Sequence, residues 1–350
     1  MLPRPMALTW SLAVPTLNRE DILVRSLLAN VRQTRLPSQV VVVDSSDGWQ
    51  RTRERVLAEV APQLPGAEWI YIGSDVKGLT RQRNLGLARC TGDVVFFLDD
   101  DSFMYRDCAE HVMQVYEADA EGRIGGVCAS LADRLEGAPV AAQKPVEDRS
   151  GLPGRVLQLA HRQWWQDRLF IPYDGRYHVR PVEGAPSDVV PVGLFHGCRM
   201  TFRAAAVRAA GGFEEMLTGA CYGEDIDVSY RVSRDRALVW AKRAVLRHEQ
   251  VPVARPKRAL NTALVVLNAI ALYKLYGPKE SDARRLAYTF LLERATLELL
   301  RDVARPRRWM PYTQGVMRAA QFAPTVLSLE GDALRKEYAG IQRRLYALCS

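Results

Sequence analysis

The sequence predicts an α/β fold, a parallel sheet flanked by helices, followed by a helical C-terminal extension. Three observations support this prediction. In the first half of the chain, short apolar runs alternate with segments of helical periodicity, the order that a parallel sheet with crossover helices requires. One apolar run leads directly into three aspartates at 99–101, and residues 258–350 look mostly helical.

The first half contains three strand–helix repeats that lead into the acidic triplet. The first helix is expected over Glu20–Thr34, where apolar residues recur at helical spacing and Asn18 can cap the start. The carboxyl ends of such strands are where open α/β sheets bind ligands. The predicted strands are Thr9–Pro15, Gln39–Val43, Trp69–Gly73 and Val94–Leu98, and the other two helices are Thr52–Val60 and Thr80–Arg89.

The pattern is interrupted in the middle of the chain. Residues 107–119 predict a helix and Arg123–Ser130 a further strand. From about 133 to 192 the chain is rich in Pro, Gly, Arg and aromatics, which predicts an irregular excursion of the kind that shapes substrate pockets. Order returns with "GCRMTFRAAAVRAAGGFEE", a strand, a short helix and a Gly-Gly stop. A helix in "YGEDIDVSYRVSR" and two short strands in "ALVWAKRAVLRHE" follow.

Composition places the chain among ordinary globular proteins. Its 350 residues, 48% hydrophobic, can form a sizeable core in two or three domains. The six cysteines include no C-x-x-C pair, which disfavours a disulfide framework or thiolate metal cluster and predicts reduced thiols. The stretch "MLPRPMALTW" has no signal-peptide core. The expected location is therefore the cytoplasm, or the cytoplasmic face of the membrane.

The net charge of +8 belongs to the C-terminal region. Residues 1–250 carry 31 basic and 32 acidic side chains, whereas residues 251–350 carry 17 and 8. A basic helical tail fits anionic lipid headgroups or a phosphorylated acceptor better than nucleic acid, and a solvated charged face is the simpler alternative. The uncharged run Ala259–Tyr273 falls short of the roughly 17–25 residues that cross a bilayer, so we expect it to lie on a membrane or pack against the preceding domain.

The acidic triplet requires something that offsets its charge. Two carboxylates about 4 Å apart repel by about 4 kcal/mol at a protein-like effective dielectric. In an extended chain Asp99 and Asp101 point to one side and Asp100 to the other. Two carboxylates on one side suit Mg²⁺ or Mn²⁺, and a solvated acidic turn is the alternative.

The triplet gains specificity from an ordered set of further motifs. These are "VPTLNR" at 14–19, "VVVDSSD" at 41–47, "KGLTRQRNLGLARCTGD" at 77–93, "GGFEE" at 211–215, "YGEDIDVSYR" at 222–231 and a lone His248. The set resembles the family 2 inverting glycosyltransferases of the GT-A fold. That resemblance implies a mixed, mainly parallel sheet, a nucleotide-sugar donor in the N-terminal half and a Mg²⁺ or Mn²⁺ ion on its diphosphate.

The resemblance also implies residue roles and boundaries. Residues 1–250 would form the GT-A domain, with a nucleotide-sugar half at 1–130, the excursion at 131–192 and an acceptor half at 193–250, and residues 251–350 a basic helical region. Asp44 would contact base or ribose, and His248 matches the position of a third metal ligand. The full donor set is Pro15, Thr16, Asn18, Arg19, Asp44, Lys77, Arg81, Asn84, Asp99 and Asp100, and the metal set is Asp99, Asp101 and His248.

Positive charge and a base complete the predicted chemistry. A nucleotide diphosphate gains negative charge as it leaves, so Lys77, Arg81 and Arg83 are candidates for a stabilising wall, or else exposed helix charges. The acceptor hydroxyl must lose its proton, and Glu224 and Asp225 open a helix whose dipole favours ionised carboxylates. Asp225 matches the family's base position. Glu224 would orient the acceptor or support Asp225, and from sequence alone the two roles could be exchanged.

The acceptor side is defined less sharply. Trp164 and Trp165 in the excursion could stack on a sugar or lipid, although adjacent helical residues cannot both face one ligand and core burial is the alternative. The string "RPRRW" at 305–309 lacks the Gln of the processive synthases' Q-x-x-R-W. We therefore expect a non-processive hexosyltransferase, with UDP the leading nucleotide and a glycan, lipid-linked or small-molecule acceptor in cell-envelope or polysaccharide biosynthesis.

Two other functions stay open at this point. A nucleotidyltransferase would show a Gly-rich, basic phosphate loop after the first strand, where this chain has "VPTLNR". A dinucleotide oxidoreductase is disfavoured because no G-x-G-x-x-G follows that strand. A non-catalytic donor-binding or scaffold protein of the same fold is the second alternative, and the presence of all the expected carboxylates argues against it.

Overall fold

The computed structural model describes residues 7–132, 170–195, 197–219, 221–249, 257–277, 280–304 and 309–349. The chain divides into two compact units. We call them the sheet unit and the helical unit. The sheet unit comprises Met1–Pro139, Tyr177–Glu214 and Glu224–Pro252, and the helical unit comprises Val140–Arg176, Glu215–Gly223 and Val253–Ser350.

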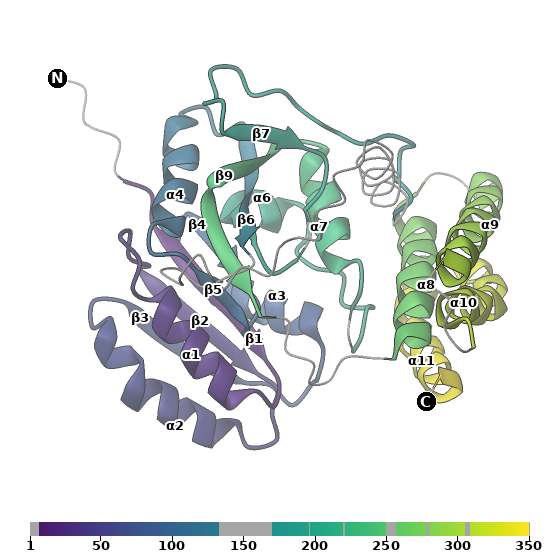
Figure 1. The fold of residues 1–350 in the computed structure, drawn as a ribbon, viewed down its shortest axis with the longest axis horizontal. Helices are drawn as coiled ribbons and strands as arrows, with labels where there is room; N and C mark the ends of the chain where they lie inside the picture. Colours follow the sequence, from purple (N-terminus) through teal and green to yellow (C-terminus); the bar gives the residue numbers. More distant parts are fainter. Residues whose placement is uncertain are drawn as a thin grey trace. The chain divides into compact units, whose positions relative to one another are not determined.

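Among the described residues, the sheet unit contains one mixed, mostly parallel sheet with helices on both faces, the predicted fold class (Figure 1). The strand order is β3-β2-β1-β4-β8-β6-β9-β5, with β7 also paired to β9. Strands β1 to β4 are mutually parallel, and β8 runs antiparallel between β4 and β6. The strands are β1 Trp10–Thr16, β2 Gln39–Asp44, β3 Glu68–Gly73, β4 Val94–Phe97, β5 Ser102–Met104, β6 Ile124–Ala132, β7 Val189–Val192, β8 Met200–Arg203 and β9 Ala237–His248.

The helices of the sheet unit follow the predicted order with small boundary shifts. The predicted cap at Asn18 is wrong: helix α1 begins after Arg19 without a side-chain cap, while Asn18 adopts a left-handed φ of 54° and donates its N–H to Ser46 Oγ at 2.6 Å. The helices are α1 Glu20–Asn30, α2 Trp49–Glu59, the 3₁₀ turn η1 Ala61–Gln63, α3 Leu79–Arg89, α4 Cys108–Ala118, α6 Ala204–Ala209 and α7 Glu224–Ser233.

The prediction of two short strands in "ALVWAKRAVLRHE" is also wrong, because this segment forms the single strand β9. Its pairing with β6 continues along the strand but shifts register twice, between Ile124 and Gly126 and between Cys128 and Ser130. Such irregularities bend a strand without ending it. The polar residues in the middle of the segment therefore mark exposed positions on a continuous strand.

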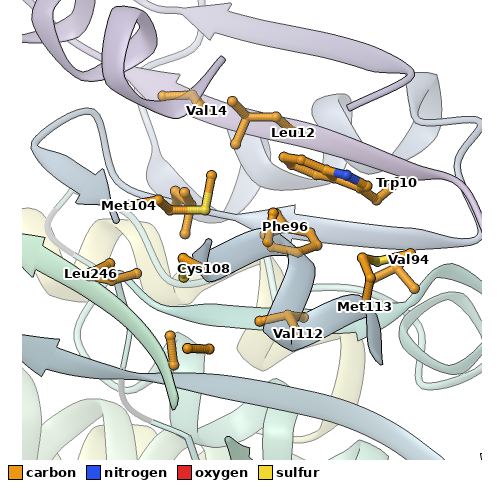
Figure 2. Close-up of a cluster of buried hydrophobic side chains, with 14 of the residues drawn as sticks. Trp10, Leu12, Val14, Val94, Phe96, Met104, Cys108, Val112, Met113 and Leu246 are labelled. Atoms are coloured by element: carbon orange, nitrogen blue, oxygen red, sulfur yellow. The ribbon is translucent and has the colours of Figure 1, made fainter. Parts of the chain in front are cut away.

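Side-chain alternation gives the sheet a core on each face. Trp10, Leu12 and Phe96 point to one face and Ala13 and Phe97 to the other. Figure 2 shows the first cluster, in which the Trp10 and Phe96 rings lie 4.2 Å apart between their centroids. Helices α1 and α4 contribute to this cluster, and α3, α6 and α7 to the other. Both faces of β1 and β4 are therefore buried, which fixes the position of the acidic residues that follow β4.

Strand β5 anchors the other end of the acidic triplet. Its residue Ser102 pairs with His248 at the end of β9. The buried Asn30 side chain of α1 donates to the Ser102 carbonyl and accepts the Met104 N–H, both at 2.9 Å. Because these bonds satisfy two backbone groups of a very short strand, they help to hold β5 beside β9.

The helical unit confirms the prediction that residues 258–350 are mostly helical. It contains α8 Arg258–Tyr276, α9 Glu280–Ala304, α10 Pro311–Ser328 and α11 Gly331–Cys349. Helix α8 is longer than its uncharged run and is long and apolar enough to cross a membrane, which corrects the expectation based on length. A single helix of this kind is weak evidence for a membrane span, and 67% of the most apolar window of α8 is buried within the structure.

A buried polar network within the helical unit holds the segment 215–223. Asn268 of α8 donates to the Tyr222 carbonyl at 2.9 Å and accepts from Tyr338 and Gln342 of α11. Gln342 in turn accepts the N–H and hydroxyl of Thr218. Two helices thereby fix the segment that immediately precedes Glu224 in the chain.

Candidate active site

Asp99 and Asp101 lie in a tight turn between β4 and β5. The Ser102 N–H donates to the Asp99 carbonyl at 3.0 Å, so this segment forms a turn. The extended conformation expected from the sequence is therefore wrong. The expected grouping is nevertheless present. One ligand atom each from Asp99, Asp101 and His248 lies within 4.8 Å of the others. Asp101 is buried, whereas Asp99 and His248 are partly exposed.

Strand pairing brings His248 to the acidic turn. The Glu249 N–H donates to the Asp101 carbonyl at 3.0 Å, and His248 Nε2 lies 2.8 Å from Asp101 Oδ1 and 3.8 Å from Asp99 Oδ2. Two carboxylates and an imidazole within such reach fit a divalent cation such as Mn²⁺ or Mg²⁺, with water and diphosphate oxygens completing its coordination. The residues present therefore fit the metal that the sequence predicts.

Asp100 turns away from this cluster, as expected. It is buried and accepts from Thr16 Oγ1 at 2.7 Å and from Arg19 Nη1 at 3.0 Å. Burial raises the pKa of Asp100 to about 6, against the opposing effects of Thr16 and Arg19. Arg19 also lies 3.5 Å from Asp101 Oδ2. Asp100 thus ties the loop after β1 to the acidic turn.

Arg83 connects the acidic turn to the start of α7. Its buried guanidinium donates from Nη2 to Asp99 Oδ1 at 2.9 Å and from Nη1 to Glu224 Oε1 at 2.7 Å. It also lies over the Phe213 ring, 5.3 Å from the centroid. From the sequence, Arg83 is only one of three candidate cations for the stabilising wall. Arg83 lies one turn before Leu87 on the buried face of α3, whereas Arg81 is exposed. This spacing from an apolar residue is the sequence signal that separates the two arginines.

Glu224 and Asp225 have different environments. Glu224 is buried against Arg83, and burial, followed by the charge of Asp225, raises the pKa of Glu224 to about 8 against the opposing effect of Arg83. Asp225 is partly exposed, and it accepts the Gly197 N–H through Oδ2 and the Ile226 N–H through Oδ1 at 2.8 Å. Asp225 is therefore the more accessible carboxylate, and Glu224 the one held in place.

The shifted pKa of Glu224 predicts a pH-dependent stability. Between its ordinary value of 4.5 and about 8, the folded chain holds a proton that the unfolded chain releases, so raising the pH lowers the free energy of unfolding. We expect metal-free Glu224→Gln to lose less thermal stability than wild type as the pH rises through this range. The exposed Glu121→Gln is the control and should follow wild type. Parallel melting curves for wild type and Glu224→Gln would contradict the shift.

The predicted base contact Asp44 is enclosed at the end of β2. It is fully buried, its Oδ2 accepts from the Tyr71 hydroxyl at 2.7 Å, and its Oδ1 accepts the Ser46 N–H at 2.7 Å. Pro15 and Thr16 end the neighbouring strand β1 and are buried as well. A nucleotide contact by Asp44 therefore stays a prediction, and it would require Tyr71 to move or share the carboxylate.

The other predicted donor residues are dispersed along this edge. Lys77 is exposed and pairs with Asp47 at 2.9 Å, and Arg81 lies on the exposed side of α3. Asn84 makes two 2.8 Å hydrogen bonds to the Phe213 backbone, a structural contact that the sequence did not indicate. Their donor roles stay predictions. The predicted acceptor residues Trp164 and Trp165 lie outside the described residues.

Comparison with known proteins finds similarity to glycosyltransferases over part of the chain. Residues 11–143 match the family described as "Glycosyl transferase family 2". A Haemophilus influenzae protein named "Uncharacterized glycosyltransferase" is 30% identical over 107 residues, which are 31% of this chain and 34% of that protein. The match thus spans about a third of the relative's length.

Several solved structures, one of them a mannosyltransferase, have a similar fold. A Pyrobaculum calidifontis mannosyltransferase in complex with GDP-Man and Mn²⁺ is 17% identical, with 98% of this chain and 87% of that chain covered and a TM-score of 0.50. S. aureus TarS 1–349 with UDP-GlcNAc is 14% identical over 97% and 89%, with a TM-score of 0.52. GalNAc-T7 with UDP, GalNAc and Mn²⁺ is 11% identical over 96% and 57%, with a TM-score of 0.56. At these identities the likeness establishes the GT-A fold.

Proposed function

We infer that this chain, whose residues 11–143 match glycosyl transferase family 2 and whose sheet has the GT-A fold, is a sugar-transferring enzyme. It is proposed to move a sugar from a nucleoside diphosphate donor to an acceptor hydroxyl with inversion. The observation that carries this proposal is the position of Arg83. One buried guanidinium contacts both Asp99 of the candidate metal cluster and Glu224 beside Asp225. Donor activation and proton removal would therefore occur in one connected site.

The proposed reaction is a single displacement. Asp225 accepts the proton of the acceptor hydroxyl, whose oxygen forms a bond to the anomeric carbon as the bond from that carbon to the diphosphate oxygen breaks. Glu224 and Arg83 hold the start of α7 against the acidic turn. A divalent cation held by Asp99, Asp101 and His248 would stabilise the charge that the diphosphate gains.

The donor is proposed to carry UDP, with GDP and dTDP as the alternatives. GalNAc-T7 and TarS, two of the proteins with a similar fold, were solved with UDP or UDP-GlcNAc, and the Pyrobaculum protein with GDP-Man. We propose a non-processive hexosyltransferase in cell-envelope or polysaccharide biosynthesis, with a glycan, a lipid-linked sugar or a small molecule as acceptor. The proposed location is the cytoplasm or the cytoplasmic face of the membrane.

A thermal-shift panel tests the donor site. UDP-, GDP- and dTDP-sugars are each added with and without Mn²⁺ or Mg²⁺, and we expect one nucleotide to stabilise the protein only in the presence of metal. A ligand at about 100 times its Kd stabilises by about 2.7 kcal/mol, which is readily visible. The same mixtures are then assayed for sugar transfer or hydrolysis. Binding without turnover would favour a scaffold, and pyrophosphate release from nucleoside triphosphates would favour a nucleotidyltransferase.

A further inference from the structure

Helix α9 buries apolar residues such as Phe290, Leu291 and Leu297, but it also buries charged residues and exposes several large apolar ones. Three charged residues, Arg294, Glu298 and Asp302, are at most 2% exposed. Arg294 pairs with Glu298, and Asp302 accepts the N–H and hydroxyl of Thr313 at 2.8 Å. The outward side instead carries the large apolar residues Tyr288, Leu292, Leu299, Leu300 and Val303, which we call the α9 face; Leu292 is 70% exposed and Val303 64%.

The spacing of the α9 face makes it a continuous strip. Residues 288, 292, 299 and 303 recur at intervals of four and seven, so they lie along one side of the helix. Trp309, 70% exposed, and Met310 come just before α10, and Met317 lies within it; all three are also exposed. In water a helix normally turns its charged side outward and its apolar side inward. An exposed apolar strip of this length, on a helix that buries three of its charged residues, indicates a surface that is covered in use.

The charges around this strip are mainly positive. Arg284 and Arg285 are exposed at one end of α9, and Arg318 lies beside Met317 on α10. Within 284–304, a fully described stretch, the acidic residues Glu298 and Asp302 are buried and Glu293 is half-buried. The exposed Asp282 forms an ion pair with Arg285, with 3.3 Å between Asp282 Oδ1 and Arg285 Nη2. Residues 251–350 as a whole carry 17 basic against 8 acidic side chains. The partner of this surface should therefore be apolar and negatively charged.

These features favour a lipid surface over a second copy of the chain. A symmetric pair would bury two copies of a mainly basic border, and its exposed carboxylate Asp282 is already paired with Arg285. A bilayer interface accommodates leucine and valine below the headgroups, tryptophan and tyrosine at headgroup level, and arginine against anionic phosphates. We propose that the α9 face, with Trp309, Met310 and Met317, docks on the surface of a membrane containing anionic phospholipid, with α9 lying in the plane of the interface.

Vesicle flotation with the full chain tests this proposal. We expect wild type to float with vesicles of phosphatidylcholine and phosphatidylglycerol at physiological salt, and much less with phosphatidylcholine alone. Leu292→Glu should weaken partitioning by about tenfold or more, because burial of one leucine side chain corresponds to at least that factor. Neutralisation of Arg284 and Arg285 to Gln should weaken it by about fivefold per residue and reduce its salt dependence. Leu36→Glu, at a 53% exposed leucine of the sheet unit, is the matched control and should bind as wild type does.

Vesicle binding is measured without sugar transfer. The membrane proposal can therefore fail while the proposed function holds, and the proposed function can fail while the membrane proposal holds. Val303→Glu is a second variant at an exposed position, and melting temperatures near that of wild type show that both variants fold. Absence of wild-type binding to anionic vesicles would overturn the proposal, as would binding that Leu292→Glu leaves unchanged. A wild-type dimer in light scattering that Leu292→Glu converts to monomer, without vesicle binding, would assign the α9 face to self-association instead.

Discussion

Asp225→Asn is expected to lower the turnover of sugar transfer by about 10²–10⁴-fold, the usual contribution of a general base. Asparagine has nearly the same shape, and its amide oxygen can still accept the Gly197 N–H that now binds Asp225. It cannot take up a proton from the acceptor. Because Asp225 is not part of the Asp99–Asp101–His248 cluster, donor and metal affinity should remain near wild type. Steady-state turnover is compared with metal-dependent thermal shifts on the same preparation.

Glu224→Gln separates the two carboxylates at the start of α7. A base at Asp225 predicts that Glu224→Gln disturbs the contact with Arg83 but keeps the pH limb that reports deprotonation of the base. A base at Glu224 predicts the loss of that limb, with Asp225→Asn only mildly impaired. Near-normal turnover of Asp225→Asn with intact donor binding would therefore end the assignment of Asp225.

The sequence predicted the parts of this site that depend on local pattern. Apolar runs that alternate with amphipathic segments predict the strands and helices up to the acidic turn, because burial of both sheet faces requires apolar side chains at every position of β4. Asp99 and Asp101 were identified as paired carboxylates that suit a divalent cation, and His248 by the resemblance of its position to the family pattern. These features can be recognised without knowing which segments of the chain are neighbours in space.

Long-range contacts could not be predicted in this way. Arg83 and Glu224 are 141 residues apart in the chain, and neither residue indicates the other by spacing. The double hydrogen bond between Asn84 and Phe213 spans 129 residues and is equally invisible. The failed cap at Asn18 has a different cause: a left-handed backbone turns this residue toward Ser46 and leaves the start of α1 without a side-chain partner.

The exposed leucines of α9 show that hydrophobic periodicity does not predict which side of a helix is buried. A helical repeat identifies two sides of a helix but does not say which side is covered. Leu292 and Leu299 predict burial by the ordinary rule, whereas the structure exposes them and buries Arg294 and Glu298 as a pair. The surroundings of the helix decide the orientation, and α8 and α10 pack against α9.

Asp101→Asn is expected to weaken Mn²⁺ or Mg²⁺ binding by at least about 100-fold and to lower metal-dependent transfer accordingly. Loss of groups that only orient metal ligands already costs about 10–100-fold, and Asp101 is a candidate ligand itself. Its Oδ1 lies 2.8 Å from His248 Nε2, so the substitution also removes the negative charge that faces the imidazole. Metal titrations monitored by thermal shift, with and without donor, give the affinity, and turnover at saturating metal gives the catalytic loss.

The adjacent Asp100 provides a matched control within the same turn. Asp100 has the same side chain but faces Thr16 and Arg19 instead of the metal cluster. Asp100→Asn should therefore keep metal affinity near that of wild type while it weakens the tie between the acidic turn and the loop after β1. If Asp100→Asn lost the metal and Asp101→Asn retained it, the cluster of Asp99, Asp101 and His248 would not be the metal site. The fold places these neighbours on opposite sides of one turn, so the pair of variants tests the geometry as well as the chemistry.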